Sequence, residues 1–247
     1  MAWAVLAESV VGTSHRTRSI PCQDAFRIHR FGTMSEWLLI CVADGAGSAS
    51  HSHIGATLAC AEFETQVHSI GPETLFLRES MLEIFARVRD ALLAEAVTLN
   101  ISHRELACTV LISVVGPESA VFAQIGDGAI VIPDGTGFRV VFWPEPAEYA
   151  NTTDFLTDEK FAETMVFETI LSPIMELAVF TDGLQRLTLD FGARQPFPRF
   201  FQPMFERVRS QDDPELLAPP FRDFLDSSRV NDRTDDDKTL VLAVRKA

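Results

Sequence analysis

Runs of apolar residues that end in Asp-Gly recur along this chain and constrain its fold more than any other feature. Trp37–Ala43 precedes Asp44-Gly45, and Leu177–Thr181 precedes Asp182-Gly183. Each run has the length and composition of a buried β-strand. A carboxylate at the end of such a strand is held rigidly, and several of them together repel one another unless a cation lies among them. The pattern therefore predicts a metal-dependent enzyme.

Three weaker acidic positions extend the pattern. Gly126-Asp127-Gly128 follows Ala120–Ile125, but Asp127 lies between two predicted strands, so an ordinary hairpin turn explains it equally well. Asp235-Asp236-Asp237 stands directly before the apolar run Thr239–Val244, although most acidic runs are simply solvated loops. Asp24 begins another predicted strand after a loop of small polar residues. We interpret all three as candidates for the same site.

The residue types favour a hard cation. Carboxylates dominate the candidates and no paired Cys or His accompanies them, which suits Mg²⁺ or Mn²⁺ better than Zn²⁺. Gly45 lacks a Cβ, so its carbonyl can approach an ion closely. The four cysteines form no CxxC pair and lie in or beside apolar segments, which predicts buried free thiols in a reducing compartment. They are Cys22, Cys41, Cys60 and Cys108.

Charge and hydropathy exclude several classes of protein. The chain has 247 residues and a net charge of −14, so nucleic acid and anionic membrane surfaces would repel it. No apolar stretch approaches the roughly 20 residues that span a bilayer. The first residues carry no basic segment and are typical of a strand rather than a signal peptide. We therefore expect a cytoplasmic protein without nucleic-acid or membrane partners.

The order of predicted elements indicates an α+β fold. Strands come first, then two long helices, a run of hairpins, further helices and a last strand, which is not the regular alternation of a parallel sheet. We expect a four-layer α/β/β/α sandwich of two mainly antiparallel sheets flanked by helices, formed as a single domain over residues 1–247. The predicted helices lie at about 54–68, 73–98 and, in two pieces, within 196–228, and residues 12–22 are predicted to be a loop.

Residues 144–171 form a long segment of loose pattern. It is too long for a simple connector, so we expect a flap-like insertion over a site. Trp143, Tyr149 and Phe155 could line a docking groove for a substrate, and packing in the core is the alternative for each of them.

Taken in order, the acidic motifs resemble the metal-dependent protein phosphatases of type 2C. No single Asp-Gly is specific, but the order and spacing match over essentially the whole chain. The loop from Gly12 to Asp24 resembles the compact bacterial branch of that family. The motifs are Gln23-Asp24, Asp44-Gly45-Ala46-Gly47, Gly126-Asp127-Gly128, Ala178–Leu184 and Asp236-Asp237-Lys238-Thr239.

The resemblance implies two Mn²⁺ or Mg²⁺ ions between the sheets. Asp44 would bridge both ions and the Gly45 carbonyl would bind one of them, while Asp182 and Asp236 bind the other. Asp24 would act through water, and Asp127 would contribute to a third site. Gln23 stands where the family has an acidic ligand. We expect Gln23 and Asp237 to contact the residues that bind the ions and to hold them in position.

Three departures from the family pattern affect the predicted chemistry. Ala46 replaces a histidine proposed as general acid, Ser19 replaces a phosphate-binding arginine, and Arg186 replaces an acidic ligand of the third metal, which would leave that third ion weakly bound or absent. Arg186, Arg16 and Arg18 are the candidates to bind phosphate. The candidates to protonate the leaving oxygen are His15, His51 and His53, with His15 preferred.

The resemblance implies a bacterial serine/threonine protein phosphatase that uses a metal-activated water. No motif for a covalent nucleophile is present, which agrees with this chemistry. The implied partners are a phosphoprotein substrate, a eukaryotic-type Ser/Thr kinase and a von Willebrand factor A protein, and we expect a monomer. Two alternatives remain open: a catalytically silent module that keeps the fold, and a phosphoesterase acting on small molecules.

Overall fold

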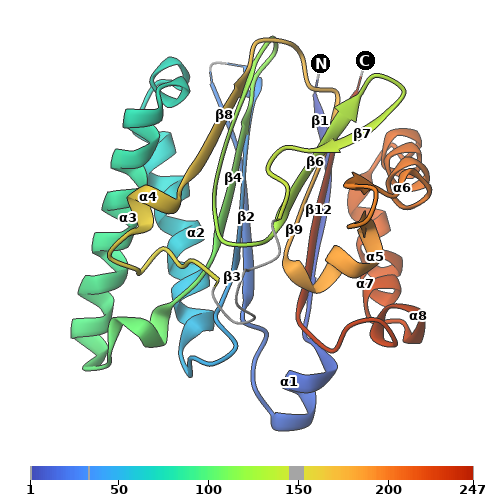
Figure 1. Cartoon of the computed structure of the whole chain (residues 1–247). Helices are drawn as coiled ribbons and strands as arrows, with labels where there is room; N and C mark the ends of the chain where they lie inside the picture. Colours follow the sequence, from blue (N-terminus) through green and yellow to red (C-terminus); the bar gives the residue numbers. More distant parts are fainter. Residues whose placement is uncertain (1, 33, 145–152, 247) are drawn as a thin grey trace.

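Two five-stranded sheets pack face to face in the computed structural model, which describes residues 2–32, 34–144 and 153–246 (Figure 1). Their strand orders are β1-β12-β9-β6-β7 and β2-β3-β4-β5-β8, and every paired neighbour runs antiparallel. The strands are β1 (Trp3–Val10), β2 (Asp24–Phe31), β3 (Trp37–Asp44), β4 (Val110–Val115), β5 (Ala120–Ile125), β6 (Ala129–Asp134), β7 (Gly137–Val140), β8 (Val166–Ile170), β9 (Glu176–Phe180) and β12 (Lys238–Arg245). A small separate pair joins β10 (Leu189–Asp190) to β11 (Gln195–Pro196). The predicted antiparallel pairing is confirmed.

Helices cover the outer face of each sheet. In Figure 1, α2 and α3 lie against the β2–β8 sheet, and α6 and α7 lie against the other sheet. The α-helices are α1 (Thr13–Arg18), α2 (Ser52–His68), α3 (Arg78–Leu99), α4 (Phe161–Thr164), α5 (Gln185–Thr188), α6 (Pro198–Ser210), α7 (Ala218–Leu225) and α8 (Ser228–Asn231). Short 3₁₀ turns are η1 (Pro72–Phe76), η2 (His103–Leu106), η3 (Asp182–Leu184) and η4 (Pro214–Leu217). The order of layers is that of the predicted α/β/β/α sandwich.

Three apolar layers hold the four structural layers together. The core under α2 and α3 contains Phe63 and Phe85, whose rings meet edge to face with centroids 4.7 Å apart. The core under α6 contains Phe201 and Phe205. Between the sheets lies a third layer, to which both contribute, for example Phe122. Because alternate residues of each strand face opposite sides, strands buried on both faces are almost wholly apolar, as their sequences indicate.

Two predictions about helices are wrong. The predicted loop 12–22 contains helix α1, whose sequence Thr-Ser-His-Arg-Thr-Arg has no apolar periodicity to indicate a helix. The long helix predicted from 73 is interrupted at Leu77, which has extended backbone angles and separates η1 from α3. Helix α3 therefore begins at Arg78.

The predicted flap needs correction over its second half. Residues 166–170 form β8, an edge strand paired with β5, and Leu156 and Met165 are buried in the core beside α3. The residues of this strand, which favour β-structure, are accommodated at the edge of the sheet. Residues 145–152, including Tyr149, lie outside the described residues.

The two described aromatic residues of the predicted docking groove have packing partners. Trp143 meets Phe191 edge to face at 5.7 Å between centroids and lies under the Arg194 guanidinium. Phe155 packs against a small cluster that includes Ala46. These contacts favour the core-packing alternative for both.

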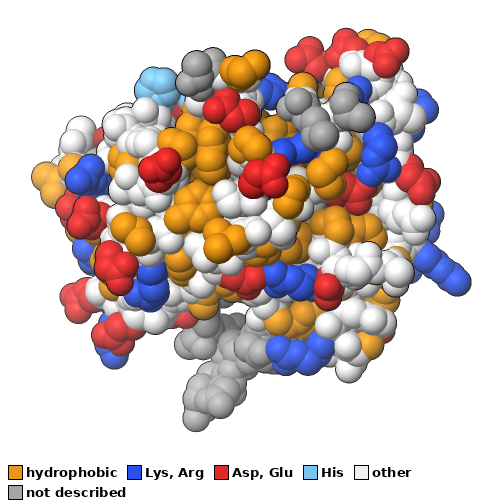
Figure 2. Space-filling model, turned by 90° about the horizontal axis from the view of Figure 1, so that it is seen from above, with side chains coloured by type: hydrophobic (Ala, Val, Ile, Leu, Met, Phe, Trp, Pro, Cys, Tyr) orange, Lys and Arg blue, Asp and Glu red, His pale blue; other side chains and the backbone are white. Residues whose placement is uncertain are grey.

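The helices of the described residues are too short or too polar to cross a membrane. Figure 2 views the sandwich from the end that carries the chain termini in Figure 1, and acidic and basic side chains are interspersed over this end.

Candidate active site

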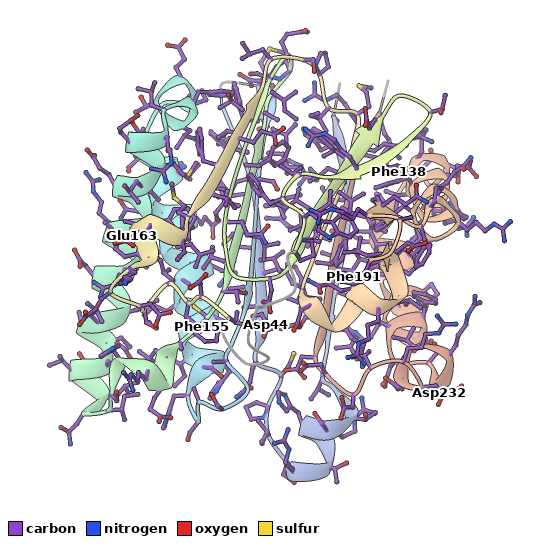
Figure 3. The ribbon with its side chains drawn as sticks, in the orientation of Figure 1. Asp44, Phe138, Phe155, Glu163, Phe191 and Asp232 are labelled. Carbon is purple, nitrogen blue, oxygen red and sulfur yellow. The ribbon has the colours of Figure 1, made fainter. Side chains whose placement is uncertain are left out.

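The ends of β3 and β9 and the starts of β2 and β12, where the acidic motifs stand, lie at the end of the sandwich opposite the chain termini (Figure 1). Asp24 begins β2 and Asp44 ends β3, and the two residues pair directly across these antiparallel strands. Asp182 follows β9 and Asp236 precedes β12, and the end of β9 meets the start of β12 because these strands are also antiparallel. Figure 3 shows Asp44 between the two sheets at this end. The topology therefore brings together acids that lie far apart in sequence.

Asp24 is buried and held by two hydroxyl groups. Its Oδ2 accepts hydrogen bonds of 2.8 Å from the Oγ1 atoms of Thr181 and Thr239, while its Oδ1 is buried without a partner. Burial, followed by the charge of Asp237, raises the pKa of Asp24 to about 8, and the two threonine bonds oppose this shift. A nearby cation would stabilise the ionised form of this carboxylate.

Asp44 and Asp182 interact directly. Burial is the main cause of the pKa of Asp44 lying well above its ordinary value, and the negative charges of Asp24 and Asp182 add to it. Burial and the charges of Asp127 and Asp236 raise the pKa of Asp182 to about 6, against which its hydrogen bond with Asp44 acts. Asp182 Oδ1 is buried without a partner. Without a cation, this pair holds its negative charge only at a cost in free energy.

Asp236 and Asp237 are neighbours with different tasks. Both carboxylate oxygens of Asp237 are bound: Oδ1 accepts from the Gly12 N–H at 2.6 Å, and Oδ2 accepts from the Gln23 N–H at 2.6 Å. His15 Nδ1 also lies 2.9 Å from Oδ2. Asp236 is exposed, and its Oδ1 accepts only the Asp237 N–H among the described residues. Asp237 therefore joins three segments, while Asp236 keeps an oxygen free for a ligand.

Two glycines fix the loop that carries these acids. A Cβ on Gly12 would lie 2.4 Å from the carbonyl oxygen of Asp235, and one on Gly183 would lie 2.0 Å from that of Asp237. The loop thus lies between α1 and η3 at a spacing that a larger side chain would prevent. This contact holds Asp236 beside the turn that carries Asp182.

Gln23 and Asp127 occupy different parts of the surroundings. Gln23 is buried, its Nε2 donates to the Ala49 carbonyl at 3.0 Å, and its Oε1 is buried without a partner. Asp127 Oδ2 accepts from Thr153 Oγ1 at 3.0 Å, and its backbone carbonyl accepts from Gln185 Nε2. Burial raises the pKa of Asp127, and its charge is felt by Asp182. Asp127 is therefore at the margin of the cluster.

Gly45 lies between the cluster and α2. Its N–H donates to the Gln23 carbonyl at 3.1 Å, and a Cβ at this position would lie 2.7 Å from Ser52. The close approach of α2 therefore requires glycine here.

A cavity of about 660 Å³ opens beside the carboxylates. Asp182, Asp236 and Arg186 line it together with Arg233, which the sequence analysis missed. The only signal for Arg233 was its place three residues before Asp236. Asp232 and Asp235 also line it, so two guanidinium groups that can bind a phosphate stand beside four carboxylates that favour cations.

The other two predicted arginines have different partners. Arg16 Nη2 forms a 2.8 Å ion pair with Asp226. Arg18 turns back on its own helix, where its Nε donates to the Ser14 carbonyl at 3.1 Å. Neither lines the cavity beside Asp182, so Arg186 is the predicted phosphate-binding residue that the fold brings to the carboxylates.

The candidate histidines also differ in position. His15 has a side chain only 4% exposed and is held by Asp237. His51 Nδ1 lies 3.9 Å from Glu105, and His53 Nδ1 is buried without a hydrogen-bond partner. The burial of His15 favours a positioning role over direct contact with a leaving group.

The donor set fits a hard cation. The buried oxygens without hydrogen-bond partners include Gln23 Oε1, Asp24 Oδ1 and Asp182 Oδ1, and these three are of the type that Mg²⁺ and Mn²⁺ prefer. In the described part of the chain, no three His, Cys, Asp or Glu side chains are arranged so that they could hold one metal ion. Asp24 and Asp182 are nevertheless close enough to Asp44 for their charges to raise its pKa. All four cysteines are free, as predicted, and three of them are buried.

Comparison with known proteins agrees with this fold. The profile of the family described as protein phosphatase 2C matches residues 11–225. Serine/threonine-protein phosphatase 3 of Escherichia coli (strain K12) is 37% identical over 254 residues, which cover 99% of each chain.

Solved structures share the architecture at lower identity. A bacterial serine phosphatase superposes with a TM-score of 0.71 at 14% identity, covering 100% of this chain and 99% of that one. Serine/threonine phosphatase Stp1 from Staphylococcus aureus gives a TM-score of 0.67 at 13% identity, covering 100% and 96%. At this identity the solved structures show the fold, while the matching family profile and the full-length relative show the family. The chain belongs to the protein phosphatase 2C family.

Proposed function

We propose that this protein phosphatase removes phosphate from phosphoserine and phosphothreonine in proteins, using Mn²⁺ or Mg²⁺. The single observation that carries the proposal is the row of carboxylates Asp24, Asp44, Asp182 and Asp236 beside a cavity with two arginines. The full-length relative named a serine/threonine-protein phosphatase supports the choice of substrate.

Asp44, Asp182 and Asp236 would hold two ions, with the Gly45 carbonyl as a further ligand and Asp24 close by. Ions bound there supply Lewis acidity, lower the pKa of a bound water and offset charge on the phosphoryl group. A third ion would have only Asp127 nearby, because Arg186 stands where the family has an acid. We therefore propose two ions, with the third weak or absent.

The chain's own residues provide orientation. Arg186 and Arg233 would bind the phosphate oxygens, since guanidinium groups donate two parallel hydrogen bonds to such groups. Asp237 keeps His15, Gly12 and Gln23 in fixed relation, which holds the ligand loop in place. His15 acts here as a positioning residue.

The silent-module alternative has less support. A protein with no use for cations would gain stability by replacing crowded acids that burial disfavours. Buried oxygens without partners at Asp24 and Asp182 therefore favour a working site. The small-molecule alternative is separated by comparing phosphopeptides with nucleotides and simple phosphate esters.

Hydrolysis of a phosphothreonine peptide tests the proposal, with EDTA, Mg²⁺ or Mn²⁺ added to the purified chain. We expect activity that depends on the metal and is lost in Asp44→Asn. A folded protein without turnover under any metal would contradict it. A cytoplasmic location, the monomeric state, the opposing kinase and the von Willebrand factor A partner stay predictions.

A further inference from the structure

A groove of about 440 Å³ lies over the helices of the second sheet, next to the cavity beside Asp182 and Asp236. It is lined by Leu187 of α5, Phe197, Arg199 and Phe200 at the start of α6, Arg229 of α8, and Arg233. Arg233 also lines the cavity beside Asp182 and Asp236, so the two hollows share a wall. We call this surface the arginine groove.

The charge of the arginine groove is opposite to that of the molecule. The chain carries 35 acidic and 21 basic residues, yet three arginines and no Asp or Glu of the described residues line this groove. Two arginines on neighbouring parts of this layer form ion pairs, Arg209 of α6 with Glu176 and Arg222 of α7 with Glu8. Within the described ranges, no carboxylate forms an ion pair with Arg199, Arg229 or Arg233. Three unpaired positive charges in a protein of net charge −14 attract an acidic partner.

The groove also has an apolar component. Phe197 is 37% exposed, and Leu187 and Phe200 are half-buried beside it. A second hollow of about 180 Å³ adjoins it, shares Leu187, Arg199, Phe200 and Arg229, and adds Met204 and Phe224. Aromatic and methionine side chains beside arginines are typical of surfaces that bind peptides. A ligand that fills both hollows presents acidic groups and a bulky apolar side chain.

We propose that the arginine groove binds the segment of a substrate protein next to its phosphorylated residue, and that it selects segments with acidic residues and one bulky apolar residue. This inference rests on the proposed function, because Arg233 places the groove directly beside the cavity where the phosphate would bind. A second phosphate in the substrate would count as an acidic group. An extended polyanion such as nucleic acid is disfavoured by the negative charge of the rest of the surface.

Two pairs of charge reversals test the groove. Arg199→Glu with Arg229→Glu removes its positive charge without touching Arg186 or Arg233. Arg87→Glu with Arg104→Glu makes the same change in charge on exposed residues of α3 and η2, and it serves as the matched control. The substrates are phosphothreonine peptides with Glu and Phe residues on the N-terminal or the C-terminal side, a peptide with Gln and Ala instead, and p-nitrophenyl phosphate.

We expect the unaltered protein to prefer one of the two acidic peptides over the neutral peptide through a lower KM. The groove double variant should lose about tenfold in kcat/KM on that peptide, the effect of two partly exposed ion pairs. Its hydrolysis of p-nitrophenyl phosphate should stay within about twofold, and the control double variant should keep the preference. Equal losses on both kinds of substrate, or equal losses in both double variants, would overturn the inference.

A binding measurement separates this inference from the proposed function. Fluorescence anisotropy of the labelled acidic peptide is measured with Asp44→Asn, alone and combined with the groove reversals. Tighter binding of the acidic than of the neutral peptide, lost on reversal, supports the groove even if no peptide is hydrolysed, in which case only the proposed function fails. Equal binding of both peptides overturns the groove, whatever the turnover.

Discussion

Asp24 and Asp44 are direct cross-strand partners at one end of the β2–β3 pair, so two carboxylates face the same edge of a buried sheet. Burial raises the pKa of both; the charge of Asp237 adds to the shift of Asp24, and the charges of Asp24 and Asp182 add to that of Asp44. Ionising these carboxylates therefore lowers the stability of the metal-free protein, and a bound cation would offset this loss. The effect on stability can be measured without any substrate.

In metal-free protein, Asp24→Asn should raise the thermal stability at alkaline pH. The folded-state pKa of Asp24, about 8, lies above the ordinary 3.8, so its contribution to stability is fully present below pH 3.8 and is lost as pH rises through 8. Asn keeps an oxygen to accept from Thr181 and Thr239. We expect Tm in EDTA to rise by roughly 5 °C at pH 8 and the difference to vanish near pH 4. The same Tm difference at both pH values would contradict the assignment.

Alanine at Asp236 and at Asp237 should give opposite results. Asp237→Ala leaves the N–H groups of Gly12 and Gln23 and the ring of His15 without an acceptor, so we expect a loss of about 3 kcal/mol in the free energy of unfolding. Asp236→Ala should abolish metal-dependent turnover while the urea midpoint in EDTA stays nearly unchanged. Equal destabilisation of the two variants would show that the loop does not divide these roles.

Gly183→Ala should destabilise the protein because its Cβ would meet the Asp237 carbonyl oxygen at 2.0 Å. We expect a loss of about 2 kcal/mol or more, measured by urea unfolding, as for other overpacked sites. Gly71→Ala is the control, since nothing lies within 4 Å of its added Cβ. A Gly183→Ala variant as stable as Gly71→Ala would mean that the loop can move away freely.

Arg186→Ala should raise KM for a phosphothreonine peptide by roughly tenfold to a hundredfold, since a charge-assisted phosphate contact is lost. Arg18→Ala should have little effect, because Arg18 is bound to Ser14 of its own helix and does not line the cavity. Steady-state kinetics with saturating Mn²⁺ measures both. If Arg18→Ala had the larger effect, α1 rather than η3 and α5 would hold the phosphate.

Much of the fold could be predicted because its strands are buried on both faces. The apolar runs that become β3 and β9 fit strands buried on both faces, and each Asp-Gly marks the point where the buried run ends. Helix α1 and strand β8 escaped prediction because both are partly exposed and therefore lack apolar periodicity. The secondary structure of such exposed elements depends on contacts with neighbouring elements, which the pattern of their own residues does not indicate.

The candidate site divides in the same way. Asp44 and Asp182 stand out in sequence because each follows an apolar run, whereas Asp24 is marked only by its place between a polar loop and a predicted strand. The different tasks of Asp236 and Asp237 depend on contacts with residues more than 200 positions away, which no local pattern contains. Arg233 likewise becomes relevant only when α8 folds beside η3.

The measurement that tests the central claim most directly is phosphothreonine-peptide hydrolysis by the unaltered chain and by Asp44→Asn, in EDTA and then with Mn²⁺ added. We predict no turnover in EDTA, turnover restored by Mn²⁺ in the unaltered chain, and none in Asp44→Asn, with circular dichroism unchanged. Turnover by Asp44→Asn near that of the unaltered chain, or full activity in EDTA, would contradict the assignment of the carboxylates to a metal-dependent phosphatase site.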